Sequence, residues 1–170
     1  MTIDLSSLLR GDVDRIDLDC AIAPDRAPDG IRLLPGASLK GTVTDLAGYV
    51  RLESTVSVPY EGECSRCLAK VRGELVFSFD RTLVAPGVID EGELEENAEN
   101  YLIINGGAID PDSAVSESVL VEFPMVLLCS PDCPGLCPHC GKKLEKDGRC
   151  DCFVPETDPR WAKLKEIKWD

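Results

Sequence analysis

A single histidine, His139, is present in 170 residues, and aromatic residues make up only 5% of the chain. With one histidine, the sequence offers no Ser–His or Cys–His pair of the kind that nucleophilic catalysis uses. It also lacks the GxxxxGK loop that cradles nucleotide phosphates. These absences argue against an enzyme and against a small-molecule substrate. They favour a protein that acts by binding, with an aliphatic rather than an aromatic core.

Long apolar runs are missing as well. No stretch approaches the roughly 18 apolar residues that a membrane span needs. The N-terminal sequence MTIDLSSLLRGDVDRID has no basic region followed by an apolar core, so it does not resemble a secretory signal. We therefore expect a cytoplasmic protein without a membrane partner, in a compartment where thiols stay reduced.

Basic residues are scarce, with 18 Lys and Arg against 31 Asp and Glu and a formal net charge of −13. Between Thr82 and Gly141 there is no Lys or Arg, and residues 90–99 (DEGELEENAE) concentrate six acidic residues. Such a run is typical of a solvated, mobile loop, and the alternative is an acidic surface for a basic protein partner. Because an acidic protein repels phosphate backbones, contact with nucleic acid would need a local basic patch.

Such a patch is conceivable only near the C-terminus, which holds eight of the 18 basic residues. They are Lys142, Lys143, Lys146, Arg149, Arg160, Lys163, Lys165 and Lys168. Seven acidic residues interrupt this region, so an attractive field for phosphate is not assured. Residues 158–169 (DPRWAKLKEIKW) also predict a helix, with Asp158 as N-cap, Pro159 at the first helical position, and Trp161 and Leu164 on one stripe.

Cysteine, by contrast, is abundant, with nine residues, eight of which stand in close pairs. The pairs are Cys64/Cys67, Cys129/Cys133, Cys137/Cys140 and Cys150/Cys152. Two residues between thiols let a tight turn point both sulfurs at one ion, which is how tetrahedral zinc sites are built. In CPHCG at 137–141, the final glycine can take the left-handed conformation by which the chain leaves the turn. Eight thiols make two sets of four, so we expect two structural Zn²⁺ ions.

Other interpretations compete for these thiols. Disulfides are disfavoured in a reducing compartment. The Cys133-x3-Cys137-x2-Cys140 spacing matches radical-SAM iron–sulfur enzymes, but that chemistry needs a large barrel and only 30 residues follow Cys140. A rubredoxin-like iron site would need a second CxxCG, which CDCF at 150–153 is not. A redox-active CxxC would be expected in a βαβ context, and none is present.

The spacing also indicates how the thiols divide. Four of them lie close enough in sequence to form a small ribbon alone, namely Cys137, Cys140, Cys150 and Cys152. Cys64 and Cys67 would then share an ion with Cys129 and Cys133, although an interleaved pairing is the open alternative. We expect His139 to face outward rather than to bind metal. Cys20 lies on the apolar face of a strand, where a free cysteine behaves as a small core residue.

Alternation of apolar and polar residues predicts a mainly antiparallel sheet. The strand patterns cover 15–22, 39–46, 50–60, 71–83 and 101–104. The strands before and after CSRC at 64–67 predict a hairpin with the paired thiols at its tip. The fold class is therefore α+β, with a few short helices. We expect a sheet domain at 1–128, a zinc-ribbon-like cysteine cluster at 129–152 packed on it, and a helical tail at 153–170.

Two short helices are predicted before the cysteine cluster. Residues 1–11 have Asp4 as a possible cap and Gly11 as a stop signal. The second helix follows Asp110, with Ser113 as its cap, and ends at Pro124. Its apolar residues are expected on the inner side, and these are Val115, Val119, Leu120 and Phe123.

Taken together, these motifs resemble those of the YceD family. The likeness rests on CSRCL at 64–68, FPMVLLCSPDCPGLCPHCGKKL at 123–144, CDC at 150–152 and DPRWAKLKEI at 158–167. The family is named for large ribosomal RNA subunit accumulation, and members are often encoded beside a small zinc-ribbon protein of that subunit. The resemblance implies a bacterial cytosolic factor for large-subunit accumulation or assembly, and it supplies no catalytic residues.

The resemblance implies a large-subunit ribosomal protein or a pre-ribosomal particle as partner. The acidic segment at 90–99 could hold a basic ribosomal protein, or the basic C-terminal end could contact rRNA. A zinc- or thiol-based redox or metal sensor is the rival hypothesis.

Overall fold

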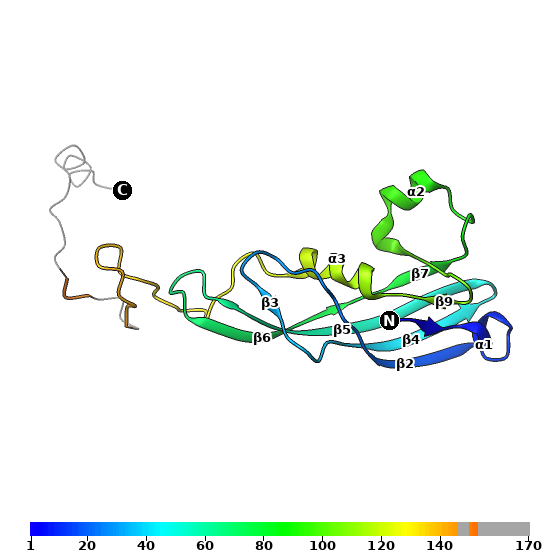
Figure 1. Ribbon diagram of the computed structural model, residues 1–170, viewed down its shortest axis with the longest axis horizontal. Helices are drawn as coiled ribbons and strands as arrows, with labels where there is room; N and C mark the ends of the chain where they lie inside the picture. Colours follow the sequence, from blue (N-terminus) through cyan, green and yellow to red (C-terminus); the bar gives the residue numbers. More distant parts are fainter. Residues whose placement is uncertain (146–149, 153–170) are drawn as a thin grey trace, which may run out of the picture.

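The computed structural model describes residues 1–145 and 150–152. A long twisted sheet is its main element, with α3 (Asp112–Glu122) along one face and the cysteine-rich segment extending beyond one end (Figure 1). Within the described residues, the sheet contains seven strands: β2 (Arg15–Ala21), β3 (Arg32–Leu33), β4 (Ser38–Leu46), β5 (Tyr49–Glu63), β6 (Lys70–Ser78), β7 (Arg81–Val84) and β8 (Tyr101–Ile103). The predicted α+β fold with a mainly antiparallel sheet is confirmed.

The smaller elements surround this sheet. They are the strand pair β1 (Ile3–Asp4) and β9 (Ala108–Ile109), the helices α1 (Ser6–Leu9) and α2 (Glu91–Glu96), and the 3-10 helix η1 (Ala98–Asn100). None of the described helices has the length and apolar character needed to cross a membrane. The predicted helix at 158–169 lies outside the described residues, and the division of the chain at residue 128 stays a prediction.

The 15-residue strand β5 is the centre of the sheet because it pairs along both of its edges. β4 and β3 pair with one edge, and β6 and β7 pair with the other. Side chains alternate along β5 as the period of two predicts, so Leu52, Val56 and Val58 are fully buried while Arg51 and Glu53 are exposed. α3 adds Val115 and Val119 to the same aliphatic core.

The hairpin predicted around CSRC is confirmed, since β5 and β6 pair from Thr55↔Ser78 to Glu63↔Lys70. The prediction of a single strand at 71–83 is wrong in one respect, because the hydrogen-bond ladder with β5 breaks between β6 and β7. At the break, the Ser54 amide donates to the Asp80 carboxylate at 3.1 Å, and the Ser54 hydroxyl donates to the Phe79 carbonyl at 2.6 Å. The side chains of Ser54 and Asp80 thus take the place of one backbone hydrogen bond of the ladder. Beyond the break, β7 pairs with β8 in parallel.

The acidic segment at 90–99 is not the solvated loop that its composition favoured. Asp90 accepts the Glu93 amide at 2.9 Å and caps α2, and η1 follows before β8. An acidic residue at the first turn of a helix also interacts favourably with the helix dipole. The acidic groups are therefore presented on an ordered element.

The short helices also differ from prediction in their details. α1 has only four residues, and Asp4 belongs to β1, although its carboxylate accepts the Ser6 amide at 2.8 Å. Ser113 is not the cap of α3, since the helix begins at Asp112 and has no side-chain cap. Leu120, expected on the inner side, is 43% exposed. The helix therefore buries a narrower stripe than its sequence suggested.

Replacing Leu52 tests the central role of β5. Because Leu52 is fully buried, Leu52→Ala is expected to lower the free energy of unfolding by about 2–5 kcal/mol. The matched control is Val76, which lies on β6 and is 57% exposed. Val76→Ala should change the free energy of unfolding by less than about 0.5 kcal/mol. Urea unfolding followed by circular dichroism measures both. Equal losses in the two variants would contradict this description of the core.

Candidate metal centres

Two groups of four cysteine thiols come together in the structure, and each group is built from two close pairs. The first thiol group contains Cys64, Cys67, Cys129 and Cys133. The second thiol group contains Cys137, Cys140, Cys150 and Cys152. In each group the four Sγ atoms lie within 4.8 Å of one another. This is the division that the sequence spacing favoured over an interleaved pairing.

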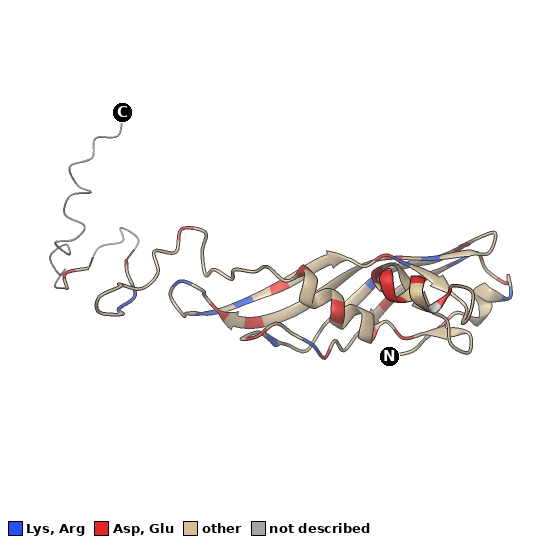
Figure 2. Ribbon diagram, turned by 90° about the horizontal axis from the view of Figure 1, so that it is seen from above, with Lys and Arg blue, Asp and Glu red and all other residues tan. Residues whose placement is uncertain are grey.

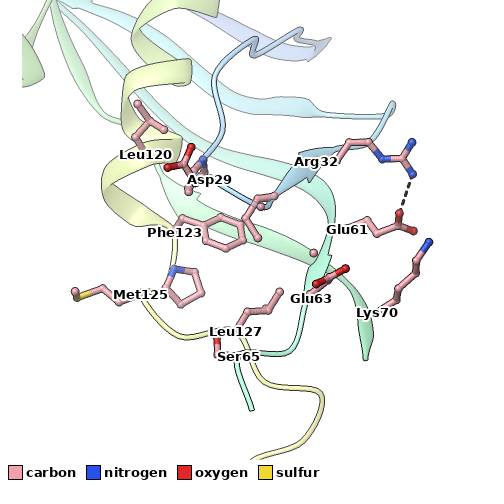
Figure 3. A pocket seen from close by; sticks show the side chains of 15 residues that line it. Asp29, Arg32, Glu61, Glu63, Ser65, Lys70, Leu120, Phe123, Met125 and Leu127 are labelled. Atoms are coloured by element: carbon pink, nitrogen blue, oxygen red, sulfur yellow. Dashed lines mark hydrogen bonds and ion pairs between the residues drawn. The ribbon is translucent and has the colours of Figure 1, made fainter. Parts of the chain in front are cut away.

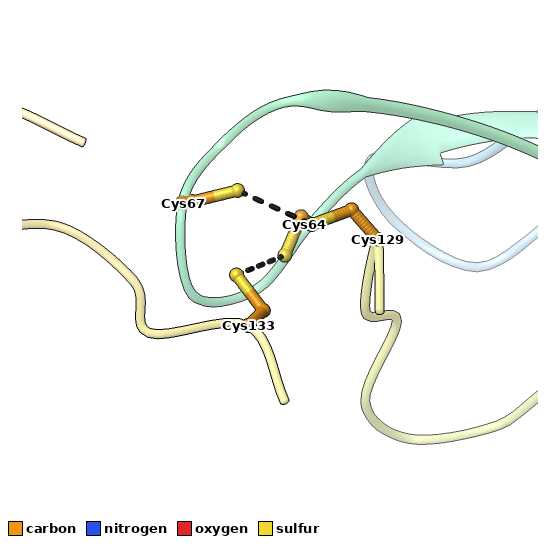
Figure 4. A group of neighbouring side chains, drawn as sticks. All are labelled: Cys64, Cys67, Cys129 and Cys133. Atoms are coloured by element: carbon orange, nitrogen blue, oxygen red, sulfur yellow. Dashed lines mark hydrogen bonds between the residues drawn. The ribbon is translucent and has the colours of Figure 1, made fainter. Parts of the chain in front are cut away.

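The first thiol group joins parts of the chain that are distant in sequence. Cys64 and Cys67 lie in the turn between β5 and β6, whereas Cys129 and Cys133 follow α3 (Figure 4). The Sγ–Sγ distances are 3.8 Å for Cys64–Cys133 and 3.6 Å for Cys67–Cys129. Four sulfurs at about 2.3 Å from a tetrahedral ion would lie about 3.8 Å apart. A disulfide would require about 2.05 Å, so these thiols are spaced for an ion and are not bonded to one another.

Backbone contacts position the thiols of the hairpin tip. The Cys64 amide donates to the Ala69 carbonyl at 2.8 Å, and the Leu68 amide donates to the Cys64 carbonyl at 2.9 Å. Leu68 closes this turn with a left-handed φ of 59°. The turn thus has the compact form that the CxxC spacing predicted, although a leucine stands where glycine would be less strained.

Two hydrogen bonds tie the hairpin tip to the segment after α3. The Ser65 amide donates to the Leu127 carbonyl at 2.7 Å, and the Arg66 guanidinium donates to the Cys133 carbonyl at 2.9 Å. Gly135 has a left-handed φ of 83°, and a Cβ there would lie 3.2 Å from the Arg66 carbonyl. Arg66 stands between Cys64 and Cys67, and the sequence names no partner for it. Its role in joining the two segments could not be inferred from spacing.

The second thiol group forms a smaller and more open arrangement. The Cys137 amide donates to the Lys142 carbonyl at 2.8 Å, and Gly141 leaves the turn with a left-handed φ of 70°. The Sγ–Sγ distances are 3.3 Å for Cys137–Cys152 and 3.5 Å for Cys140–Cys150. Cys137 is buried, but Cys140 is exposed. Solvent therefore reaches this group more easily than the first.

The ninth cysteine and the single histidine lie outside both groups. Cys20 is partly buried and packs against the main aliphatic core, as its position on an apolar strand face predicted. The His139 side chain is exposed, and it is not among the clustered side chains. Each candidate centre consequently offers four sulfurs and no nitrogen ligand.

Electrostatics explain why the first thiol group favours a cation. Burial opposes ionisation of Cys64, but the backbone amides of Cys129, Arg66 and Cys67 outweigh it and lower the pKa of Cys64 to about 6. Burial and the adjacent thiols raise the pKa of Cys133 to about 12. One thiolate therefore forms readily, while accumulating negative charge resists the ionisation of its neighbour. A bound divalent ion would remove this conflict, since metal ligands must be deprotonated.

The same pattern recurs in the second thiol group. The backbone amides of Cys140 and His139 lower the pKa of Cys137 to about 6. The neighbouring thiols of Cys137 and Cys150 raise the pKa of Cys152 to about 12. Both groups therefore combine an easily ionised thiol with one that is held protonated by its neighbours. Two metal ions could be held by these eight thiols.

Comparison with known proteins places the chain in a family. Residues 52–168 match the family model described as "Large ribosomal RNA subunit accumulation protein YceD". The chain belongs to the YceD family. The matched residues include both thiol groups in full. By its name, the YceD family is associated with the accumulation of large-subunit ribosomal RNA.

Curated relatives of this YceD protein occur in mycobacteria. An uncharacterised protein of Mycobacterium bovis is 34% identical over 179 residues, which cover 98% of this chain and 81% of that protein. An uncharacterised protein of Mycobacterium tuberculosis has the same identity and coverage. An uncharacterised protein of Mycobacterium leprae is 32% identical over 127 residues, covering 74% of this chain and 56% of that protein. No solved structure matches the chain.

Single cysteine substitutions test whether the two thiol groups are separate metal sites. Cys64→Ser is expected to remove one bound ion and Cys137→Ser the other, because each group loses one of its four sulfurs. Cys20→Ser, outside both groups, should retain both ions and is the matched control. Elemental analysis of the purified variants measures the metal-to-protein ratio. Loss of both ions from either single variant would contradict two independent sites.

Proposed function

We propose that this YceD protein is a non-enzymatic factor that supports accumulation of large-subunit ribosomal RNA. It acts by binding a ribosomal protein or a pre-ribosomal particle in the cytoplasm. The match to a family named for this process, over residues 52–168, carries the proposal. The structure is compatible with a binding role, because the two groups of four cysteines among the described residues suit structural metal ions.

The metal that we propose for both thiol groups is Zn²⁺. Tetrahedral sets of four cysteines are typical of structural zinc sites, and such a set leaves no open position for a catalytic water. In the first group, zinc would fix the hairpin tip to the segment after α3. In the second, zinc would organise a segment whose sequence, at 137–152, contains only one large aliphatic residue, Leu144. Zinc is thus proposed to stabilise the binding surface rather than to perform chemistry.

The charge distribution favours a basic protein as the direct partner. Acidic residues lie on α2 and α3 on the same face of the molecule (Figure 2). Glu95 and Glu96 of α2 and Glu99 of η1 are exposed, and no ion pair of the described residues involves them. A surface of this kind attracts Lys- and Arg-rich proteins and repels phosphate.

Most basic residues of the sheet, in contrast, lie beside acidic partners. Arg15 pairs with Asp17 at 2.8 Å, and Lys40 pairs with Asp19 at 3.1 Å. Arg51 similarly lies 3.3 Å from Glu53. The described part of the sheet therefore offers little unpaired positive charge to an RNA backbone. An rRNA contact, if it contributes, would involve the basic C-terminal end.

A redox or metal sensor is a second candidate function. The exposure of Cys140 in the second thiol group favours it, because oxidants react with accessible thiolates. Under this hypothesis, mild peroxide would release zinc and change partner binding together. Zinc release without a change in binding would leave the group with a structural role only.

Complementation tests the proposed function and its partner surface together. A strain lacking this protein is expected to show a lower ratio of large-subunit to small-subunit rRNA, measured on total RNA. The wild-type chain should restore the ratio. The variant Glu95→Gln/Glu96→Gln/Glu99→Gln should restore it poorly, since it removes three exposed acidic groups. A variant with the same change in charge on the sheet, Asp17→Asn/Asp19→Asn/Glu53→Gln, is the matched control and should restore it. An unchanged ratio in the deletion strain would refute the function.

Salt dependence separates the two binding modes. Direct binding to rRNA through Z phosphates predicts a log–log slope with salt of roughly −0.7Z for single strands. Binding of a basic ribosomal protein at α2 and η1 predicts loss of affinity in the triple Gln variant and a shallower salt response. A steep slope that the triple variant leaves unchanged would favour rRNA as the direct partner.

A further inference from the structure

Strand β6 has one long edge without a partner among the described residues. It pairs with β5 along one side, and no described strand pairs with the other side, which we call the outer edge of β6. The strand lies at the border of the sheet, toward the cysteine-rich segment (Figure 1). Six of its nine residues are exposed. A free edge of this length is a template on which another strand can pair.

The outer edge of β6 presents the backbone groups of alternate residues. The Cys64 amide donates to the Ala69 carbonyl at 2.8 Å, which fixes one end of the ladder with β5. At the other end, the Phe79 amide donates to the Ser54 carbonyl at 2.8 Å. Because hydrogen-bonded and non-hydrogen-bonded pairs alternate in an antiparallel ladder, the odd-numbered residues of β6 bond to β5. The even-numbered residues turn their amides and carbonyls outward, and they are Lys70, Arg72, Glu74, Val76 and Ser78.

The other described edges of the sheet carry features that discourage strand pairing. β3 and β8 have only two and three residues. On β2, the Ile22 amide donates to the Ala37 carbonyl, so the same alternation turns the backbone groups of Asp17 and Asp19 outward. These two aspartates would face one another in a second copy of β2 and would repel it. β6 has no proline and carries charges of both signs.

The charges of β6 match those of a second, antiparallel copy of the same strand. When Gly73 of both copies lies on the two-fold axis, Arg72 of each copy faces Glu74 of the other in a hydrogen-bonded pair. Lys70 then faces Val76 and lies diagonal to Glu74 of the second copy. A shift by two residues in either direction would bring two arginines or two glutamates directly opposite each other, which is unfavourable. The strand therefore specifies one register.

A groove of about 690 Å³ opens beside the start of β6, and Ile31, Gly62 and Phe123 are among the residues that line it (Figure 3). Its rim carries charges of both signs, namely Arg32 and Lys70 together with Asp29, Glu61 and Glu63. Arg32 also pairs with Glu61 at 2.8 Å. The rim therefore selects neither an acidic nor a basic partner. The outer edge of β6, by contrast, selects a matching strand through both hydrogen bonds and charge.

We propose that two copies of this chain form a dimer by antiparallel pairing of the outer edges of β6, with Gly73 on the two-fold axis. Arg72 binds Glu61 of its own chain through Nε at 2.6 Å, which leaves its two terminal nitrogens for Glu74 of the second copy. The two sheets become one continuous sheet, and the two-fold axis places both α3 helices on the same face. The dimer does not depend on which ribosomal partner the protein binds.

Sedimentation equilibrium of the full, metal-loaded chain over a range of concentrations tests the proposal. Because a strand pair covers less area than a standard interface of about 1,600 Å², we expect a reversible dimer with a dissociation constant in the micromolar range. Glu74→Arg should raise this constant about tenfold or more, since it places two arginines opposite each other. Arg72→Glu should act in the same way through two glutamates. Arg72→Glu/Glu74→Arg should restore association, because each cross-strand pair again joins opposite charges.

Asp17→Arg is the matched control, since it makes the same change of charge as Glu74→Arg on the edge strand β2. It should leave the dissociation constant unchanged, and circular dichroism and metal content should be equal in all the variants. A chain that stays monomeric at every concentration, or a mass above that of two chains, would overturn the proposal. Single reversals without effect, or a double variant that fails to associate, would overturn it as well.

Amide hydrogen exchange checks the register of the dimer. The amides of Arg72 and Glu74 point outward in the single chain, so they should exchange more slowly above the dissociation constant than below it. The amides of Asp17 and Asp19, on the opposite edge of the sheet, should show no such change. Slowing of the β2 amides in place of the β6 amides would contradict pairing through the outer edge of β6.

Discussion

Mutual repulsion among closely spaced thiolates is the constraint on which the arrangement of this YceD protein depends. Four sulfurs within 4.8 Å of one another cannot all ionise in the absence of a cation. The opposed pKa shifts of Cys64 and Cys133 express this conflict. The first thiol group brings the tip of a long hairpin to a segment more than 60 residues later, so whatever neutralises these sulfurs also fixes these two segments to each other.

The two halves of the molecule are held together by different forces. The sheet relies on aliphatic burial, with Leu52, Val56 and Val58 of β5 at its centre. Among the described residues of 129–152, the buried apolar side chains are those of Cys133 and Cys137. The proposed zinc ions would supply there what hydrophobic contacts supply in the sheet. This contrast explains how the cysteine-rich segment, which has little core of its own, could be held in a fixed geometry.

Local patterns predicted much of this structure because their causes are local. A period of two identifies a strand face, and a CxxC spacing identifies a knuckle. The sequence therefore predicted β2, β4 and β5, and it favoured the observed division of the eight thiols over an interleaved one. The break at Asp80 was not predictable, because it depends on Ser54 in a neighbouring strand. The α2 helix was missed because its acidic composition outweighed the Asp90 cap signal. The groove lined by Ile31, Gly62 and Phe123 was also not predictable, because these residues are distant in sequence and meet only through the fold.

We propose that a tetrahedral zinc ion occupies each thiol group. X-ray absorption spectroscopy at the zinc edge of the purified full chain tests it most directly. Two zinc ions per chain are expected, each with four sulfur ligands at about 2.3 Å. A protein that folds without bound metal and has all nine cysteines freely titratable would contradict it.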